Sequence, residues 1–192
     1  MHILFPTLFL FFASTAAAQT IYYVDQNRQP GDGSSWQSPF NTIQEGVSAA
    51  QAAGGGEVWV GPGTYQETVF LSSGVDLRGG FKGTEGSPGE RSEDALTTID
   101  IGVAGAPARP LTGVNLVDVE VEQFRLTGGK SSDQEPSSGG GIYLDNPADS
   151  VIIRRCTIEG NAAVDGGGVY VRGGSGVQIL DCLIRENRAS DD

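Results

Sequence analysis

The sequence has 192 residues, a formal net charge of −12 at pH 7, two cysteines and one histidine. So acidic a chain is poorly suited to nucleic acid or to an anionic membrane surface, because both attract basic proteins. The charge is compatible with calcium or with an extracellular surface. Two cysteines are too few for a fold framed by disulfides.

Residues 1–18 predict a secretory signal peptide. An apolar run over residues 3–12 precedes Ala16-Ala-Ala18, which has the small-residue pattern of a cleavage site. This run is shorter than the roughly 18–20 apolar residues that span a bilayer, and no later segment is apolar enough to do so. We therefore expect a secreted or cell-surface protein without a membrane span after signal removal. Removal also takes away His2, the only histidine, which excludes Ser-His-Asp chemistry and histidine–metal sites.

Residues 19–56 predict an N-terminal strand, a loop and a capping helix. The strand-like segment at the start is followed by a loop over residues 26–39, rich in glycine, proline and serine. Thr42 and Glu45 then have the spacing of a capping box, which predicts a short amphipathic helix ending at Gly54-Gly-Gly56. Because an open stack of strands exposes apolar side chains, we expect this helix to cover its first turn.

Residues 57–192 contain a repeat of 26 to 27 residues. Gly139-Gly-Gly-Ile-Tyr-Leu144 returns as Gly166-Gly-Gly-Val-Tyr-Val171. The segments Val151–Ala163 and Val177–Ala189 share the pattern Val-x-Ile-x-x-Cys-x-Ile-x-x-Asn-x-Ala. Self-similarity at such a period is typical of stacked supersecondary units.

The apolar spacing within the repeat indicates short strands joined by corners. Steps of two residues point side chains to one face of a strand, and steps of three mark corners after which the next strand again points inward. A degenerate copy, Val114-x-Leu116-x-x-Val119-x-Val121-x-x-Phe124, has the same steps. Such a unit buries its apolar side only when stacked on its copies. The sequence therefore predicts an all-β fold, a right-handed parallel β-helix, with loops projecting at residues 79–95, 104–110 and 130–138.

Stacking predicts columns of equivalent side chains along the repeat. Asn161 and Asn187 fall at equivalent corners, where their amides are able to hydrogen-bond along the stack. Cys156 and Cys182 share an inward position. A disulfide and two packed thiols are both open there, and the parallel Cβ vectors favour the thiols.

Charged columns follow from the same alignment. Asp118, Arg155 and Asp181 share one outward position, so that acid, base and acid alternate. Glu159 lies under Arg185. Opposite charges on neighbouring strands contribute about 0.2–1 kcal/mol each and help to fix the register.

Two further columns provide candidate ligand sites. Glu122 and Glu159 share a position in this alignment, and two stacked carboxylates need either Arg185 or a cation such as Ca²⁺ between them. Tyr143 and Tyr170 stack on the outer face, where they form either a plain aromatic pair or a platform for binding carbohydrate.

Four N-terminal motifs and the repeats carry a resemblance to a known family. The motifs are Tyr22-Tyr-Val-Asp25, Gly31-Asp-Gly-Ser-Ser-Trp36, Ser38-Pro-Phe-Asn-Thr-Ile-Gln44 and Val58-Trp-Val-Gly-Pro-Gly-Thr-Tyr65. They resemble the start of secreted right-handed β-helix proteins of the pectin-lyase-like superfamily. The glycine and Cys-x-Ile-x-x-Asn-x-Ala repeats are similar to those of bacterial polymorphic outer-membrane-protein-like chains. The resemblance implies the fold but no single activity.

Two functions follow from this resemblance. The first is a non-catalytic secreted or cell-surface β-helix in adhesion, display or contact with a polysaccharide or a host or cell-surface glycan. The second is the N-terminal part of a polysaccharide lyase, whose relatives use calcium-bound carboxylates and a Lys or Arg base. Asp191-Asp192 resembles the aspartates of polygalacturonases, but neither Asn-Thr-Asp nor Gly-His-Gly accompanies it. Because another Gly-Gly-Gly would follow in register, we expect further coils or a C-terminal anchor domain.

Overall fold

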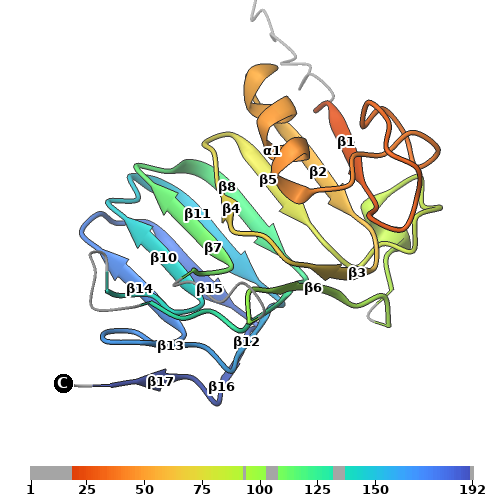
Figure 1. Ribbon diagram of the computed structural model, residues 1–192. Coiled ribbons are helices and arrows are strands. Elements are labelled where there is room, and N and C mark those ends of the chain that lie inside the picture. Colours follow the sequence, from red (N-terminus) through yellow and green to blue (C-terminus); the bar gives the residue numbers. More distant parts are fainter. Residues whose placement is uncertain (1–18, 93, 103–107, 132–136, 191–192) are drawn as a thin grey trace, which may run out of the picture.

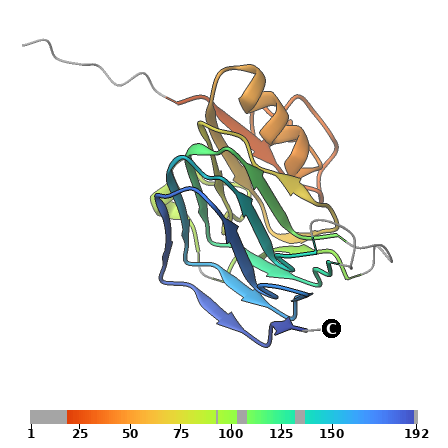
Figure 2. The same cartoon turned by 90° about the vertical axis from the view of Figure 1, so that its left-hand side faces the viewer.

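The computed structural model describes residues 19–92, 94–102, 108–131 and 137–190. The predicted signal peptide, residues 1–18, and the pair Asp191-Asp192 lie outside these ranges. The described chain forms a parallel β-helix, with one α-helix and β1 at one end and the C-terminal coil at the other (Figures 1 and 2). The predicted fold class is confirmed.

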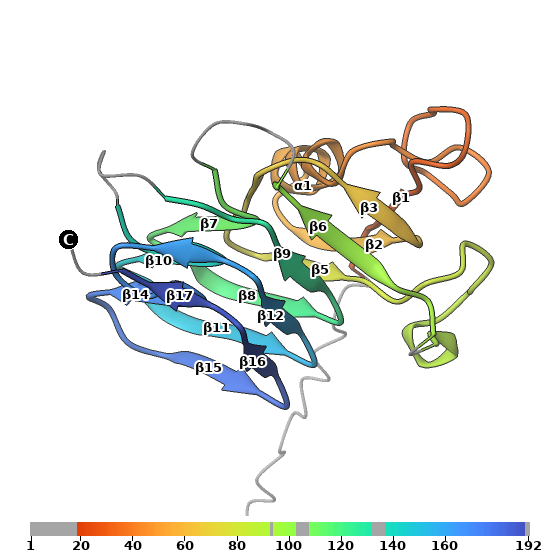
Figure 3. The same cartoon turned by 60° about the horizontal axis from the view of Figure 1, so that its bottom comes forward.

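Four parallel sheets run along the stack (Figure 3). Sheet A contains β1 (Ile21–Val24), β2 (Gly56–Val60), β5 (Val75–Arg78), β8 (Val117–Glu122), β11 (Asp149–Arg154) and β15 (Val177–Leu180). Sheet B contains β3 (Gly63–Tyr65), β6 (Thr97–Asp100), β9 (Arg125–Thr127), β12 (Thr157–Glu159) and β16 (Leu183–Arg185). Sheet C contains β4 (Val69–Phe70), β7 (Leu111–Val114), β10 (Ile142–Asp145) and β14 (Val169–Arg172), and the last sheet pairs β13 (Ala162–Ala163) with β17 (Arg188–Ala189).

The two-and-three spacing of apolar residues produces the coil as predicted. In β11, Val151 and Ile153 point into the core and are fully buried. Arg155 then adopts a left-handed conformation, with φ of 50°, and turns the chain so that Cys156 and Ile158 also point inward. A non-glycine residue in this conformation carries about 1 kcal/mol or more of strain, which the packing on both sides of the corner offsets.

The register of the degenerate copy differs from the predicted one by five residues. Val119 pairs with Val151, and Val121 with Ile153, whereas the alignment placed Val114 opposite Val151. The reason is that steps of two and three repeat every five residues, so a shift by five preserves the apolar pattern. The hydrogen bonds of sheet A select one of these equivalent registers.

This shift changes two predicted columns. Asp118 lies one residue beyond the Val117–Asp149 pair, so it stacks on Ser150, and both have left-handed backbones. The predicted Asp118–Arg155–Asp181 column is therefore wrong in its first member, since Gln123 occupies that place. Arg155 donates to the Gln123 side chain at 3.1 Å, and the pairing of Arg154 with Leu180 places Asp181 over Arg155.

The asparagine ladder is confirmed. Asn161 is buried, and its Nδ2 donates to Asn187 Oδ1 at 3.0 Å and to the Leu126 carbonyl at 3.1 Å. Its Oδ1 accepts from the backbone N–H of Gly129 at 2.9 Å. Asn187 in turn donates to the Ile158 carbonyl at 2.8 Å. The amides thus satisfy backbone groups of two successive coils and link to each other, as buried polar groups require.

Helix α1 (Ile43–Ala52) closes the N-terminal end of the core, as expected. The capping box of Thr42 and Glu45 is present, and Glu67 accepts hydrogen bonds from the first two backbone N–H groups of the helix. The buried face of the helix, which includes Ile43 and Val47, belongs to the same core as the coils. Figure 1 shows the helix beside β1 and β2.

A second, aromatic cluster lies on the outer side of the first coils. It consists of Trp36, Trp59 and Phe81, with Trp59 and Phe81 stacked at 4.6 Å between ring centroids. Trp36 also donates its indole N–H to the Glu85 carbonyl at 3.0 Å. These contacts hold residues 79–92, which include the 3₁₀ turn η1 (Pro88–Glu90), against sheet A.

Asn161→Ala is expected to lower the free energy of unfolding by about 2–4 kcal/mol, because it removes the side-chain acceptor of the buried Gly129 N–H and the side-chain donor to the carbonyls of Leu126 and Glu159. Asn187→Ala should lower it by less than half as much, since Asn187 is partly exposed and water is able to replace its amide. Urea unfolding of both variants measures the difference. Equal losses at the two positions would contradict the ladder.

Candidate functional site

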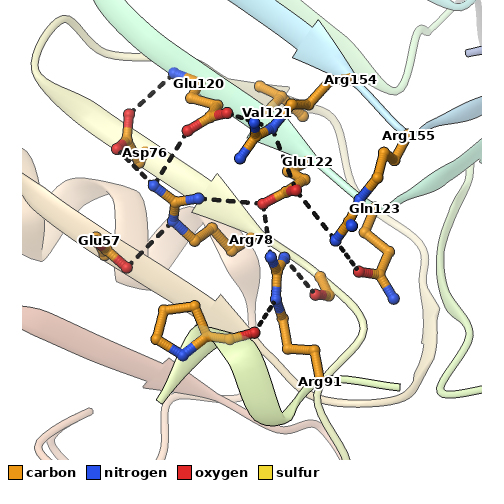
Figure 4. Close-up of polar contacts among 12 residues, drawn as sticks. Glu57, Asp76, Arg78, Arg91, Glu120, Val121, Glu122, Gln123, Arg154 and Arg155 are labelled. Carbon is orange, nitrogen blue, oxygen red and sulfur yellow. Dashed lines mark hydrogen bonds and ion pairs between the residues drawn. The ribbon is translucent and has the colours of Figure 1, made fainter. Parts of the chain in front are cut away.

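Charged side chains gather on the outer face of sheet A. Within each strand, alternation sends Arg78, Glu122 and Arg154 outward, and the register places these three directly beside one another. Asp76 and Glu120 form an adjacent pair, in which the Glu120 N–H donates to Asp76 Oδ1 at 2.9 Å. Figure 4 shows how these side chains converge.

Glu122 lies at the centre of this cluster. Its side chain is 2% exposed and contacts four arginines. Its Oε2 lies 3.1 Å from Arg78 Nη1 and 2.7 Å from Arg91 Nη2, and its Oε1 lies 3.2 Å from Arg154 Nε and 3.1 Å from Arg155 Nη2. Burial alone would raise the pKa of Glu122, but the hydrogen bond and charge of Arg91, with the charges of Arg154 and Arg155, lower it below its usual value.

Arg78 balances the acidic side of the cluster. Besides Glu122, it contacts Glu57 at 3.1 Å, Asp76 at 3.2 Å and Glu120 at 3.1 Å. Burial would lower the pKa of Arg78, but the four carboxylates, Glu57 foremost, raise it. Burial raises the pKa of Asp76. Arg78 is thus a permanently charged residue whose donors are directed at protein carboxylates.

Arg91 joins the cluster from the projecting segment rather than from a strand. Its Nε donates to the Pro88 carbonyl at 2.8 Å, and its guanidinium lies 5.5 Å from the centre of the Phe81 ring. The side chain is nearly buried, with 7% exposed. Because the aromatic cluster holds Phe81, Arg91 is positioned by packing and fixes the segment over Glu122.

The four arginines line a cleft of about 540 Å³, which we call the arginine cleft. Its walls are Arg78, Pro88, Gly89, Arg91, Glu122, Gln123, Arg154, Arg155 and Asp181. Four of the twelve lysines and arginines of this acidic chain therefore meet at one place. A smaller pocket of about 190 Å³ adjoins it and shares Gln123 and Arg155.

The arginines of the cleft differ in how much they expose. The side chains of Arg78 and Arg91 are 13% and 7% exposed, whereas those of Arg154 and Arg155 are 39% and 45% exposed. The inner pair neutralises Glu122, and the outer pair is partly exposed, although the Nε of Arg154 is itself buried. Guanidinium groups match carboxylate, sulfate and phosphate geometry, so this arrangement is suited to binding an anion.

The predicted stacking of Glu122 on Glu159 is wrong. Glu122 pairs with Arg154, whereas Glu159 pairs with Thr127 on one side and Arg185 on the other. The Glu159 carboxylate lies 2.7 Å from Arg185 Nε, as predicted, and 2.6 Å from Arg125 Nε. The two guanidiniums lower the pKa of Glu159. Since both glutamates are neutralised by arginines, the stacking argument for Ca²⁺ no longer holds.

Tyr143 and Tyr170 stack as predicted, with ring centroids 5.9 Å apart and planes 10° from parallel. Ile142 and Leu144 point into the core. Tyr143, however, is buried rather than exposed, and the Arg109 guanidinium lies 4.8 Å from its ring centre. Of the two, only Tyr170 is partly exposed, so the aromatic surface open to a glycan is smaller than expected. Glycan binding by the pair stays a prediction.

Cys156 and Cys182 occupy equivalent inward positions, and both thiols are free, as favoured. Cys156 is buried and Cys182 is partly exposed. A side-chain hydrogen bond with Cys156, together with backbone N–H groups, lowers the pKa of Cys182. That same hydrogen bond and burial raise the pKa of Cys156.

Of the residues that make the cleft, sequence reasoning singled out Glu122, Arg155 and Asp181; it stacked Asp181 on Arg155 correctly but placed Glu122 in the wrong column. It missed Arg78, Arg91 and Arg154. One signal was present: Arg78, Glu122 and Arg154 each end a strand of sheet A, directly before a corner. An alignment of these three strand ends gives the correct register and predicts that the three charged side chains lie side by side.

Comparison with protein-family models, with curated proteins and with solved structures found no match. Within the described ranges, no helix has the length and apolar character needed to cross a membrane. The same residues contain no group of three or more His, Cys, Asp and Glu side chains arranged to hold a metal ion.

Glu122→Gln is expected to lower the free energy of unfolding at pH 7 by about 3–5 kcal/mol, because it leaves buried guanidiniums without their carboxylate. A carboxyl whose pKa is lower in the folded than in the unfolded state stabilises the folded protein at pH values above its unfolded pKa of about 4.3. This stabilisation is lost as the pH falls through the pKa of the folded state. The difference between wild type and variant should therefore shrink below about pH 4. Denaturant unfolding at pH 7, 5 and 3.5 tests this.

The matched control is Glu120→Gln, which removes a more exposed carboxylate from two of the same arginines. It should destabilise less at pH 7. A Glu122→Gln variant as stable as wild type at pH 7, or a difference that grows on acidification, would contradict the central place of Glu122.

Cys182 is expected to react with iodoacetamide well before Cys156, because it is the more exposed thiol and its pKa is lowered. Peptide mass spectrometry after brief labelling of the folded protein measures the ratio, which should exceed about tenfold and disappear in denaturant. Faster labelling of Cys156 would contradict the assigned stacking.

Proposed function

We propose that this protein is an exported, non-catalytic β-helix that binds an acidic glycan through the arginine cleft. One observation carries the proposal. In a chain with a net charge of −12, four arginines converge on a single buried carboxylate and line a cleft of about 540 Å³.

The balance of charge inside the cleft supports this function. Glu57, Asp76 and Glu120 lie outside the cleft walls, where Glu120 contacts both Arg78 and Arg154, and the carboxylates of the walls are those of Glu122 and Asp181. Arg154 and Arg155 are the partly exposed cations of these walls, so a negatively charged ligand suits them. Uronate carboxylates and sugar sulfates offer the paired oxygens that a guanidinium fork binds.

The fold and the predicted export suit such a role. A parallel β-helix presents rigid rows of outward side chains and supports loops from its corners, which positions binding residues with little conformational freedom. Its resemblance to the pectin-lyase-like superfamily, together with the predicted signal peptide, favours a polysaccharide at the outside of a cell as the ligand.

The protonation states of the cleft favour binding over catalysis. A lyase needs a base that accepts a proton near neutral pH, whereas the carboxylates around Arg78 raise its pKa further. Glu122 has a lowered pKa and is surrounded by four arginines, so it is poorly placed to donate a proton. Arg78 and Glu122 therefore stay charged near neutral pH and are unsuited to proton transfer.

The double variant Arg154→Gln/Arg155→Gln is expected to weaken binding of polygalacturonate or alginate at least about tenfold, because each charge-assisted hydrogen bond contributes about 1.5–3 kcal/mol. Neutral dextran should not bind either protein. Isothermal titration calorimetry at 50 and 200 mM salt measures the affinities, and wild-type binding should weaken with salt.

The matched control is Arg172→Gln/Arg185→Gln, which removes two exposed arginines from the C-terminal coil and should leave binding unchanged. If both double variants weaken polymer binding equally, the binding depends on diffuse charge attraction and the proposed binding at the arginine cleft is wrong. Release of unsaturated products from either polymer, detected by ultraviolet absorbance, would replace binding by lyase activity.

A further inference from the structure

The smaller pocket that adjoins the arginine cleft lies at the corner between sheets A and B. We call it the Leu96 pocket; its volume is about 190 Å³, and its walls include Leu96, Arg125 and Arg155. Gln123 and Arg155 line both cavities. Sites for a complete drug-sized ligand typically measure about 300–1,000 Å³. The Leu96 pocket is therefore suited to one unit of a larger ligand that also occupies the cleft.

Both cavities form because one coil turns this corner differently from its neighbours. The next two coils turn it through Gln123-Phe124 and Arg155-Cys156, whereas a long segment joins β5 to β6 and projects beside the stack (Figure 3). Arg91 of this segment lines the cleft, and Leu96, at its return to β6, lines the pocket. The sheet B strands of the pocket, β6, β9 and β12, lie between β3 and β16, so the pocket is built within the stack.

Gln123 forms the wall between the two cavities and is held from both sides. Its Nε2 donates to the Ser92 carbonyl at 2.9 Å. Its Oε1 accepts from Arg155 Nη2 at 3.1 Å, and Figure 4 shows these two side chains next to each other. The wall is therefore fixed to the projecting segment and to the following coil, and a ligand that occupies both cavities passes over it.

The Leu96 pocket combines an apolar side chain with positive charge. Leu96 is 57% exposed, and the side chains of Arg125 and Arg155 are 36% and 45% exposed. None of the described residues that line the pocket carries a carboxylate. Glu159, which pairs with Arg125, is shared with Arg185, so one negative charge faces two guanidiniums. Such a pocket suits a group with an apolar face and an anionic edge.

An acidic sugar unit has both of these features, because C–H groups form the faces of its ring and its anionic group lies at the edge. We propose, on the basis of the proposed function of the cleft, that the Leu96 pocket binds the next acidic unit of the same glycan chain. The first unit pairs with Arg154 and Arg155, and the second lays its ring against Leu96 with its anionic group toward Arg125. The ligand class is thus a glycan with acidic groups on adjacent units.

Three small sugars separate binding at one cavity from binding at both. They are galacturonate, digalacturonate and an aldobiouronic acid, in which one uronate is linked to a neutral sugar. Amide shifts in NMR titrations of the protein at 50 mM salt give the dissociation constants. Digalacturonate should bind at least about tenfold more tightly than galacturonate, because the link makes the second contact intramolecular. The aldobiouronic acid lacks the second charge and should bind within about threefold of galacturonate.

Leu96→Glu places a carboxylate in the pocket at an exposed position, where the core is not disturbed. Because like charges repel, it should weaken binding of digalacturonate at least about tenfold and change that of galacturonate by less than about threefold. The matched control is Phe70→Glu, which adds the same charge on β4 at a side chain that is 58% exposed. It should leave the binding of both sugars unchanged.

The outcomes distinguish the pocket from the cleft. Equal affinity for galacturonate and digalacturonate, or an aldobiouronic acid that binds as tightly as digalacturonate, would overturn the second subsite while leaving binding at the cleft intact. Equal weakening by Leu96→Glu and Phe70→Glu would do the same, since the effect would then come from net charge. If none of the three sugars binds, the proposed function of the cleft is overturned together with the pocket.

Discussion

In-register parallel stacking is the constraint on which the rest of this structure depends. Each coil places its residues directly over those of the previous one, so an inward position becomes an apolar column and an outward position becomes a column of exposed side chains. Asn161 shows the consequence inside the core, where one amide bonds to the coil before it and to the coil after it. A column is stable only when its neighbours are compatible, and this applies to charges as strictly as to methyl groups.

The arginine cleft follows from that constraint. Stacking brings Arg78, Glu122 and Arg154 together, and the segment carrying Arg91 covers the carboxylate at their centre. A carboxylate buried in this way is stable only if it is paired, which explains why several arginines gather around it. Because more guanidinium groups meet Glu122 than one carboxylate can fully engage, the outer ones keep donors that face solvent. Neutralising the buried carboxylate thus leaves partly exposed guanidinium groups at the surface, on which the proposed anion binding rests.

Much of the fold was readable from local patterns. The two-and-three spacing predicted the coils, the capping box predicted α1, and the repeated Asn and Cys predicted ladders whose partners lie within one period of each other. The error in the predicted register also arose from a local pattern. A pattern that repeats every five residues does not distinguish registers five residues apart, so Asp118 and Glu122 were assigned to the wrong columns. The cleft was hidden for a further reason, since Arg91 reaches it through aromatic packing of Phe81 that no periodicity describes.

The buried and the partly exposed arginines of the cleft have different roles. Arg91 is held by the Pro88 carbonyl, the Phe81 ring and Glu122, so its donors and its position are already committed. Arg155 stands on a left-handed corner, with one nitrogen shared between Glu122 and Gln123 and much of its side chain exposed. Arg91 fixes the segment that covers Glu122, and Arg155 exposes its guanidinium to solvent. Because the corner is set by the backbone of three stacked coils, the exposed guanidinium is pre-organised, and pre-organisation would reduce the entropy lost on binding the anion proposed above.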